Sequence, residues 1–266
     1  MTKHNVLCAD DYSLNPAINA GIVGLLAQGR LSAVSCMTQS PTWAEDAKAL
    51  LPWQDRADIG LHFNLSHPFA NIYSLPLPQL MLQSSLRIIS RDKIRDSIRW
   101  QLDAFEKAMG RAPDFIDGHH HVHIFPVIRN IIIKEYVARY GALQNTKPYM
   151  RSLENLPATT NNTKAAVLKA MGIPAYARLL KKHAIPHNSA FAGIYNFNND
   201  ENLDQLMHEW LNAMPDSALV MCHPAHKNHS NEDDIAYRRF DEFTYLSSEQ
   251  FLQTMHINKI KLSRLN

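Results

Sequence analysis

The sequence predicts an α/β fold in one domain, built as a parallel sheet or as a barrel of βα units. Short apolar runs alternate with segments whose apolar residues recur at helical spacing, and polar residues follow several of the runs. The 266 residues are 45% apolar, enough to bury a full core in one large domain or two small ones. We find no internal repeat and no linker, so a single domain over residues 1–266 is expected.

The first part of the chain predicts three strands and two helices. Asn15-Pro16 suits an N-cap followed by proline at the first helical position, and Gly29 can end that helix. A second helix can end at Gly110, shortly before Pro113. In order, we expect a strand at 5–9, a helix from 16 to about 29, strands at 31–37 and 58–65, and a helix over about 92–109.

The second part predicts two more strands around a stretch of weaker pattern. A strand at Phe115-Ile116 leads to a helix over 126–140, and a last strand spans 218–222. Residues 144–200 contain scattered prolines and no clear periodicity. We interpret this stretch as an insertion that shapes a substrate cleft.

Composition limits the partners and the compartment. With 27 basic and 25 acidic residues, the chain gives no electrostatic reason to expect nucleic acid or an anionic membrane. No apolar run approaches the roughly 18–20 residues of a membrane span, and no signal-peptide cleavage site follows the N-terminus. Cys8, Cys36 and Cys222 are widely spaced and lie in or beside apolar runs, which indicates buried free thiols in a reducing compartment. We therefore expect a soluble cytoplasmic protein, with a homodimer as one possible assembly.

The most informative motif is the sequence Asp-Gly-His-His-His-Val-His at residues 117–123, directly after an apolar run. Imidazole is the commonest protein ligand of transition metals, and α/β enzymes keep their chemistry at the carboxyl ends of strands. An exposed polar turn, or histidines satisfied by backbone carbonyls, are the alternatives. If the strand continues, alternation places His119, His121 and His123 on one face and His120 on the other.

Polar residues also end other predicted strands. The adjacent carboxylates of Asp10 and Asp11 repel each other unless a cation or a shared proton compensates, although one of them could simply cap the next turn. In the third strand His62 and Asn64 share a face, where a lone histidine is more often a core residue. A carboxylate and two histidines from three strand ends would form a three-ligand site for metal-assisted hydrolysis. His223, after the last strand, is then left as a proton donor.

Five motifs, in this order, resemble those of the YdjC-like (ChbG/HpnK) carbohydrate deacetylases. They are Ala9-Asp10-Asp11-Tyr12, Gly60-Leu61-His62-Phe63-Asn64-Leu65-Ser66, Asp117-Gly118-His119-His120-His121-Val122-His123, Met221-Cys222-His223-Pro224-Ala225, and Arg239-x-x-Glu242 followed by Leu246-Ser247-Ser248. The resemblance covers almost the whole chain. It implies a deformed (β/α) TIM-like barrel, a divalent metal, and removal of an acetyl group from an N-acetylated sugar such as a chitooligosaccharide.

The resemblance also implies roles for individual residues. Asp11, His62 and His119 hold the metal, Asp10 is the general base and His223 is the general acid. The metal polarises the acetyl carbonyl while Asp10 takes a proton from water. His223 then protonates the sugar nitrogen, so that acetate and a free amino sugar are formed.

Other residues of the motifs are predicted to contact the substrate; they are Asn64, His121, His123 and Arg239. This chain departs from the family pattern after the two aspartates, because it has Tyr12-Ser13 where the family usually has Phe-Gly. Residues 144–200 match no motif. The size and identity of the acetylated sugar therefore stay open.

The metal and the reaction class leave alternatives. Two histidines and a carboxylate suit zinc, manganese or cobalt, whereas the resemblance also permits magnesium, so both Mg²⁺ and Zn²⁺ stay open. The alternative functions are another metal-dependent barrel hydrolase, such as a phosphoesterase or a cyclic amidohydrolase, and a non-catalytic metal- or sugar-binding protein. A phosphoesterase should show arginine or lysine beside the ligand motifs, and none flanks them. Asp10 and His223, which are not needed as ligands, favour catalysis over mere binding.

Overall fold

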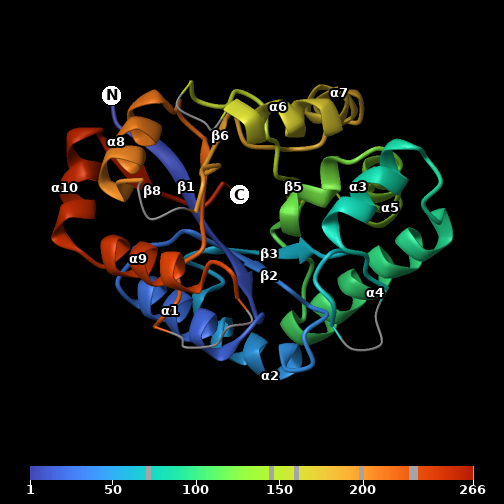
Figure 1. Cartoon of the computed structure of the whole chain (residues 1–266). Helices are drawn as coiled ribbons and strands as arrows, with labels where there is room; N and C mark the ends of the chain where they lie inside the picture. Colours follow the sequence, from blue (N-terminus) through green and yellow to red (C-terminus); the bar gives the residue numbers. More distant parts are fainter. Residues whose placement is uncertain (70–72, 144–146, 159–161, 198–200, 228–232, 266) are drawn as a thin grey trace.

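A computed structural model describes residues 1–69, 73–143, 147–158, 162–197, 201–227 and 233–265. The strands are β1 (Lys3–Tyr12), β2 (Ala33–Cys36), β3 (Asp58–Phe63), β4 (Phe115–Gly118), β5 (Tyr149–Met150), β6 (Phe191–Ala192), β7 (Leu219–Cys222) and β8 (Ile260–Leu262). They form a parallel sheet in the order β5-β4-β3-β2-β1-β7-β6, and β8 pairs with the first residues of β1. The sheet is curled, and the helices lie around it (Figure 1).

The α-helices are α1 (Pro16–Ala27), α2 (Trp43–Asp46), α3 (Leu77–Ser85), α4 (Arg91–Met109), α5 (Ile128–Tyr140), α6 (Asn162–Met171), α7 (Ile173–Lys182), α8 (Leu203–Ala213), α9 (Ala236–Leu246) and α10 (Glu249–Ile257). Short 3₁₀ segments are η1 (Ala47–Ala49), η2 (Leu51–Trp53) and η3 (His119–Ile124). On one side of the sheet α4 packs against α5, and on the other side α8, α9 and α10 pack together (Figure 1).

The outer strand β5 is linked to the segment just before the other outer strand, β6. Among the described residues one parallel bridge links Met150 to His187, and the Met150 N–H donates to the Pro186 carbonyl over 2.9 Å. The sheet is therefore a deformed barrel, and the predicted α/β barrel is confirmed.

Local sequence explains the helices that were predicted. The side chain of Asn15 accepts a hydrogen bond from the Ile18 N–H, and Pro16 opens α1, as expected of an N-cap. Helix α4 starts after Ser90 and ends at Gly110, whose φ of 69° suits a residue without a Cβ. All residues of β2, β3, β4 and β7 are buried, as expected for parallel strands covered on both faces.

The stretch at 144–200, predicted as an insertion, contains two strands of the barrel sheet. β5 pairs with β4, and β6 pairs with β7. Residues 144–146, 159–161 and 198–200 of this stretch lie outside the described residues. Between β5 and β6, the described residues form the helices α6 and α7, which lie outside that sheet (Figure 1). The shaping of a substrate cleft by this stretch stays a prediction.

The cysteines agree with the sequence expectation, since Cys8, Cys36 and Cys222 are all buried and unbridged. Among the helices that are described, none is both long enough and apolar enough to cross a bilayer.

Candidate metal centre and active site

A bulge in β1 lies at the two aspartates, whose side chains contact different partners. The strand continues to Tyr12 instead of stopping at Ala9, and its pairing with β2 shifts between these two residues. Asp11 has a φ of 69°, so the regular alternation of side chains is interrupted there. Asp10 and Asp11 are both buried and contact different partners, so each carboxylate is compensated separately.

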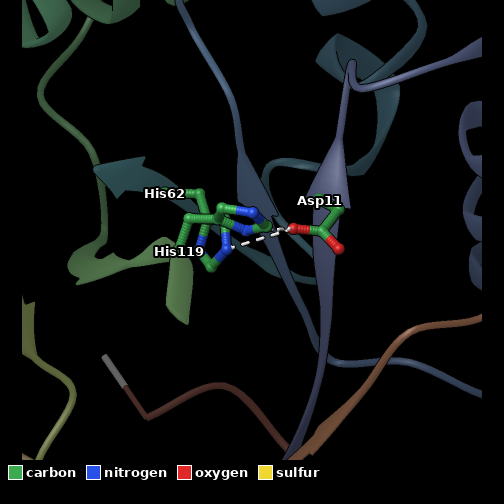
Figure 2. Close-up of side chains that lie close together, drawn as sticks. All are labelled: Asp11, His62 and His119. Carbon is green, nitrogen blue, oxygen red and sulfur yellow. Dashed lines mark hydrogen bonds and ion pairs between the residues drawn. The ribbon is translucent and has the colours of Figure 1, made fainter. Parts of the chain in front are cut away.

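Asp11, His62 and His119 point toward one another (Figure 2). Oδ1 of Asp11 lies 3.2 Å from Nε2 of His62 and 2.9 Å from Nδ1 of His119. One donor atom from each residue lies within 4.8 Å of the other two. The three residues come from the ends of β1 and β3 and from the first position after β4, where the parallel strands of the sheet deliver their carboxyl ends to one edge. Their role as metal ligands remains a prediction.

The histidine cluster is not a continued strand. β4 ends at Gly118, and the next residues form η3. His120 and His121 have φ values of 51° and 57°, in the left-handed region that residues other than glycine rarely adopt. The predicted alternation of side chains along this segment is therefore wrong, and the turn directs His119 toward Asp11 while sending the other histidines elsewhere.

His121 and His123, predicted as substrate contacts, lie on another side of η3. His121 packs edge-on against Phe191, with ring centroids 5.6 Å apart. His123 is fully buried, and its Nε2–H donates to the carbonyl of Arg151 over 3.1 Å. Burial lowers the pKa of His123 to about 4. His123 is therefore held by a backbone contact and is not accessible to a substrate. The role of His121 as a substrate contact stays a prediction.

Asp117 is the second partner of His62. Its Oδ1 lies 2.7 Å from Nδ1 of His62 and accepts a 2.6 Å hydrogen bond from Ser35 Oγ. With a proton on Nδ1 directed at Asp117, the Nε2 lone pair of His62 faces Asp11, as when a carboxylate orients a metal-binding histidine. Burial lowers the pKa of His62, but Asp117 and Asp10 outweigh burial and raise it to about 10. The carboxylates around His62 therefore attract a proton or a metal cation to Nε2, so these residues fit a divalent ion.

Sequence reasoning missed Arg151, which is fully buried directly after β5. Its Nη1 and Nη2 each donate to one oxygen of Asp10 over 2.6 Å, and Nη2 also lies 2.5 Å from Oδ2 of Asp117. An arginine directly after the apolar pair Tyr149-Met150 was the available signal, but the stretch matched no motif. Arg151 holds the predicted base in one orientation.

Arg239 holds the second oxygen of Asp11. Its Nη2 donates to Oδ2 of Asp11 over 2.6 Å, and its Nε donates to Asp233 over 2.8 Å. Burial raises the pKa of Asp11, but Arg239 and then His119 outweigh burial and hold that pKa well below its usual range. Arg239 was predicted as a substrate contact, and the structure places it against Asp11, where it leaves Oδ1 directed at the two histidines.

His223 lies at the end of β7 with its side chain half-buried. Its backbone N–H donates to Glu242, whose other oxygen accepts a 2.5 Å hydrogen bond from Tyr195. Within the described part of the chain, Nδ1 of His223 is buried without a hydrogen-bond partner. Burial lowers the pKa of His223 to about 4, with Asp11 and Asp10 acting in the opposite direction. The role of His223 as the general acid stays a prediction.

Asn64, also predicted as a substrate contact, is fully buried and organises the loop after β3. Its Oδ1 accepts from the N–H groups of Ser66 and His67 over 3.0 and 2.8 Å. Its Nδ2 donates to Gln39 and to the His67 carbonyl over 2.7 and 2.9 Å. The loop places the His67 ring 6.3 Å from the His119 ring, so Asn64 positions a neighbour of the centre.

Fold and site together define a parallel α/β barrel with a buried carboxylate–histidine cluster at the carboxyl ends of its strands. The sequence profile of the YdjC-like protein family matches residues 6–256. The chain therefore belongs to the YdjC-like family.

Known proteins resemble the chain at moderate identity. A chitooligosaccharide deacetylase of Serratia marcescens is 31% identical over 140 residues, which cover 50% of this chain and 55% of that protein. A carbohydrate deacetylase of Mus musculus is 25% identical over 83% of this chain and 77% of its own length. A chitooligosaccharide deacetylase of Citrobacter koseri is 24% identical, with coverages of 93% and 92%.

One solved structure matches over the full chain. It is a protein of Enterococcus faecalis whose name connects it with cellobiose-phosphate cleavage, and it is similar with a TM-score of 0.74 and 17% identity, covering 100% of this chain and 98% of that one. At this identity the similarity supports the fold.

Proposed function

We propose that the chain is a metal-dependent carbohydrate deacetylase that removes the acetyl group from an N-acetylated sugar of the chitooligosaccharide type. The observation that carries the proposal is the convergence of Asp11, His62 and His119 on one point, with Asp10 one residue before Asp11. The names of the relatives, which describe carbohydrate and chitooligosaccharide deacetylases, support it.

The proposed cation site consists of Asp11 Oδ1, His62 Nε2 and His119 Nδ1. A divalent cation bound there would polarise the acetyl carbonyl and ease the deprotonation of water. Two nitrogen donors and one oxygen favour zinc, manganese or cobalt over magnesium. Because Arg239 engages Oδ2 of Asp11, one oxygen of this carboxylate is left for the cation.

Asp10 is the proposed general base. Arg151 grips both of its oxygens, so the carboxylate has one orientation before substrate binds and needs no reorganisation during the reaction. Oδ1 also accepts from the Cys8 thiol, so Oδ2 is the oxygen proposed to accept the proton of the attacking water.

His223 is the proposed general acid. With a pKa of about 4 it is neutral at rest near pH 7, so it must gain its proton during turnover. The proton that Asp10 takes from water would be passed on to His223, which returns Asp10 to the carboxylate. As imidazolium, His223 would be a strong acid toward the sugar nitrogen. Donation of this proton as the C–N bond breaks would yield acetate and a free amino sugar.

The same geometry bears on the phosphoesterase alternative. A phosphate ester needs cationic side chains to neutralise its charge. The two guanidinium groups beside the centre, Arg151 and Arg239, are each engaged by two carboxylates within the described residues. This arrangement favours a neutral amide over a phosphate as the substrate.

Acetate release tests the proposal. Purified protein, supplied with zinc, manganese, cobalt or magnesium, is incubated with N-acetylated glucosamine oligomers, and free amine and acetate are measured. Equal amounts of both products, formed only with an added metal, are expected. Cleavage of a phosphate ester without acetate release would favour the alternative, and binding of the sugar without any product would favour a non-catalytic protein.

A further inference from the structure

An aromatic ring stands beside His223. The ring of Phe197 is half-buried, and its centroid lies 5.3 Å from that of His223 at an interplanar angle of 82°. The hydroxyl of Tyr237, on α9, donates to the Phe197 carbonyl. Lys164 Nζ, from α6, lies 5.0 Å from the centroid of the Phe197 ring and donates to the Tyr195 carbonyl over 2.6 Å. The backbone of Phe197 is thus tethered to α9, and Lys164 of α6 lies over one face of its ring.

Helix α9 connects this ring to the metal centre. Its inward residue Arg239 reaches Asp11, whereas Tyr237 is 43% exposed on the outer surface. The hydroxyl of Tyr237 donates to the Phe197 carbonyl, and part of the Tyr237 ring faces solvent. The same short helix therefore positions a proposed ligand and tethers an aromatic group beside the proposed acid.

The chemistry assigns this side of the site to the sugar. An acetamide has an acyl side, which must face the proposed cation, and an amine side, which must face the proton donor. Because His223 would protonate the nitrogen, the pyranose ring that carries this nitrogen must lie on the His223 side, next to Phe197.

We propose that Phe197, tethered by Tyr237, is the platform against which the sugar ring bearing the acetamido group packs. This inference rests on the proposed deacetylase function and names a residue that would set sugar affinity. The axial C–H groups of a pyranose carry partial positive charge, and an aromatic ring is negative on its face, so the two attract. A ring held before binding loses little entropy when the sugar arrives.

Binding of the reaction product tests the platform independently of turnover. Isothermal titration calorimetry is performed with the deacetylated glucosamine disaccharide on the wild-type chain and on Phe197→Leu, which keeps an apolar side chain but removes the ring. Phe197→Tyr is the conservative variant. Trp100→Ala is the matched control, because Trp100 is a 49% exposed aromatic residue on α4. Thermal unfolding of each variant checks that the fold is kept.

The expected result is a roughly two- to tenfold weaker binding constant in Phe197→Leu, with near wild-type values in Phe197→Tyr and Trp100→Ala. KM for the N-acetylated disaccharide should rise by a similar factor. Unchanged disaccharide binding in Phe197→Leu, or an equal loss in Trp100→Ala, would overturn the platform.

The outcomes also separate the platform from the enzyme activity. If the wild-type chain releases acetate and Phe197→Leu has the same KM, the platform is rejected and the deacetylase function stands. Disaccharide binding that depends on Phe197, in a chain that releases no acetate with any metal, would reject the deacetylase and leave a sugar site.

Discussion

The chain up to residue 123 and the chain from residue 147 onward contribute different kinds of groups to the site. The first part provides the residues proposed to meet the cation and the water, which are Asp10, Asp11, His62 and His119. The second part provides the residues that hold or complement them, which are Arg151, His223, Arg239 and Glu242. The strands differ as well, since β1 has 10 residues and both β5 and β6 have 2.

This difference has an electrostatic reason. The carboxylates of the first part are buried next to each other, which is costly unless cations compensate them. Arg151 and Arg239 bring those cations from the far part of the chain. The second part thus makes a concentration of negative charge tolerable, and that charge is what a divalent ion requires.

Removing a proposed metal ligand should have the largest effect, because it breaks the contribution of the first part directly. We expect Asp11→Ala, His62→Ala and His119→Ala each to lose bound metal and acetate release together. Asp117→Asn, which alters only the group that orients His62, should lower metal affinity by about 10–100-fold. Elemental analysis of the purified variants measures this, and full metal occupancy in His62→Ala would refute the assignment.

Asp10→Asn tests whether the base is distinct from the ligands. The amide keeps the shape of the carboxylate but cannot take up the proton of water, so turnover should fall by roughly 10²–10⁴ while metal content is retained. Steady-state kinetics and metal analysis on the same preparation give both quantities. Turnover close to that of the wild-type chain would mean that another group receives the proton.

His223→Ala tests what the second part contributes to the chemistry. We expect the fold and the metal to be retained, and most activity on an N-acetylated sugar to be lost because the leaving amine needs a proton. Activity on 4-nitrophenyl acetate, whose leaving group departs without one, should fall much less. An equal loss on both substrates would instead assign His223 to binding or to stabilising the oxyanion.

A smaller effect is expected at the contact between the two parts, where His123 donates to the Arg151 carbonyl. Burial lowers the pKa of His123 to about 4, from 6.5 for an exposed histidine. Below pH 6.5 the unfolded chain therefore binds this proton before the folded chain does, and stability should fall as the pH drops toward 4. The contribution is at most about 1.4 kcal/mol per pH unit. Urea unfolding between pH 7 and pH 4.5 should show a shallower dependence in His123→Phe, and an identical slope would exclude this residue as a cause.

The sequence predicted the barrel and the convergent residues because both leave local signals. The helix caps at Asn15 and Gly110 obey short-range rules, and Asp11 and His62 stand in motifs at strand ends. The path of η3 was not predictable, because His120 and His121 both adopt left-handed backbone angles, which residues other than glycine disfavour. The surrounding fold stabilises this backbone conformation. Arg151 was missed for a similar reason, since its meaning lies in Asp10, which is distant along the chain.

Metal titration of the metal-free protein tests the central claim most directly. The wild-type chain is stripped with a chelator, dialysed and titrated with Zn²⁺, while bound metal and acetate release from an N-acetylated glucosamine disaccharide are followed in the same samples. We expect negligible release from the stripped chain and a rise that is complete near one bound ion per chain. Full acetate release from the stripped protein, or saturation with metal without any release, would contradict a carboxylate–histidine centre that works as a metal-dependent deacetylase.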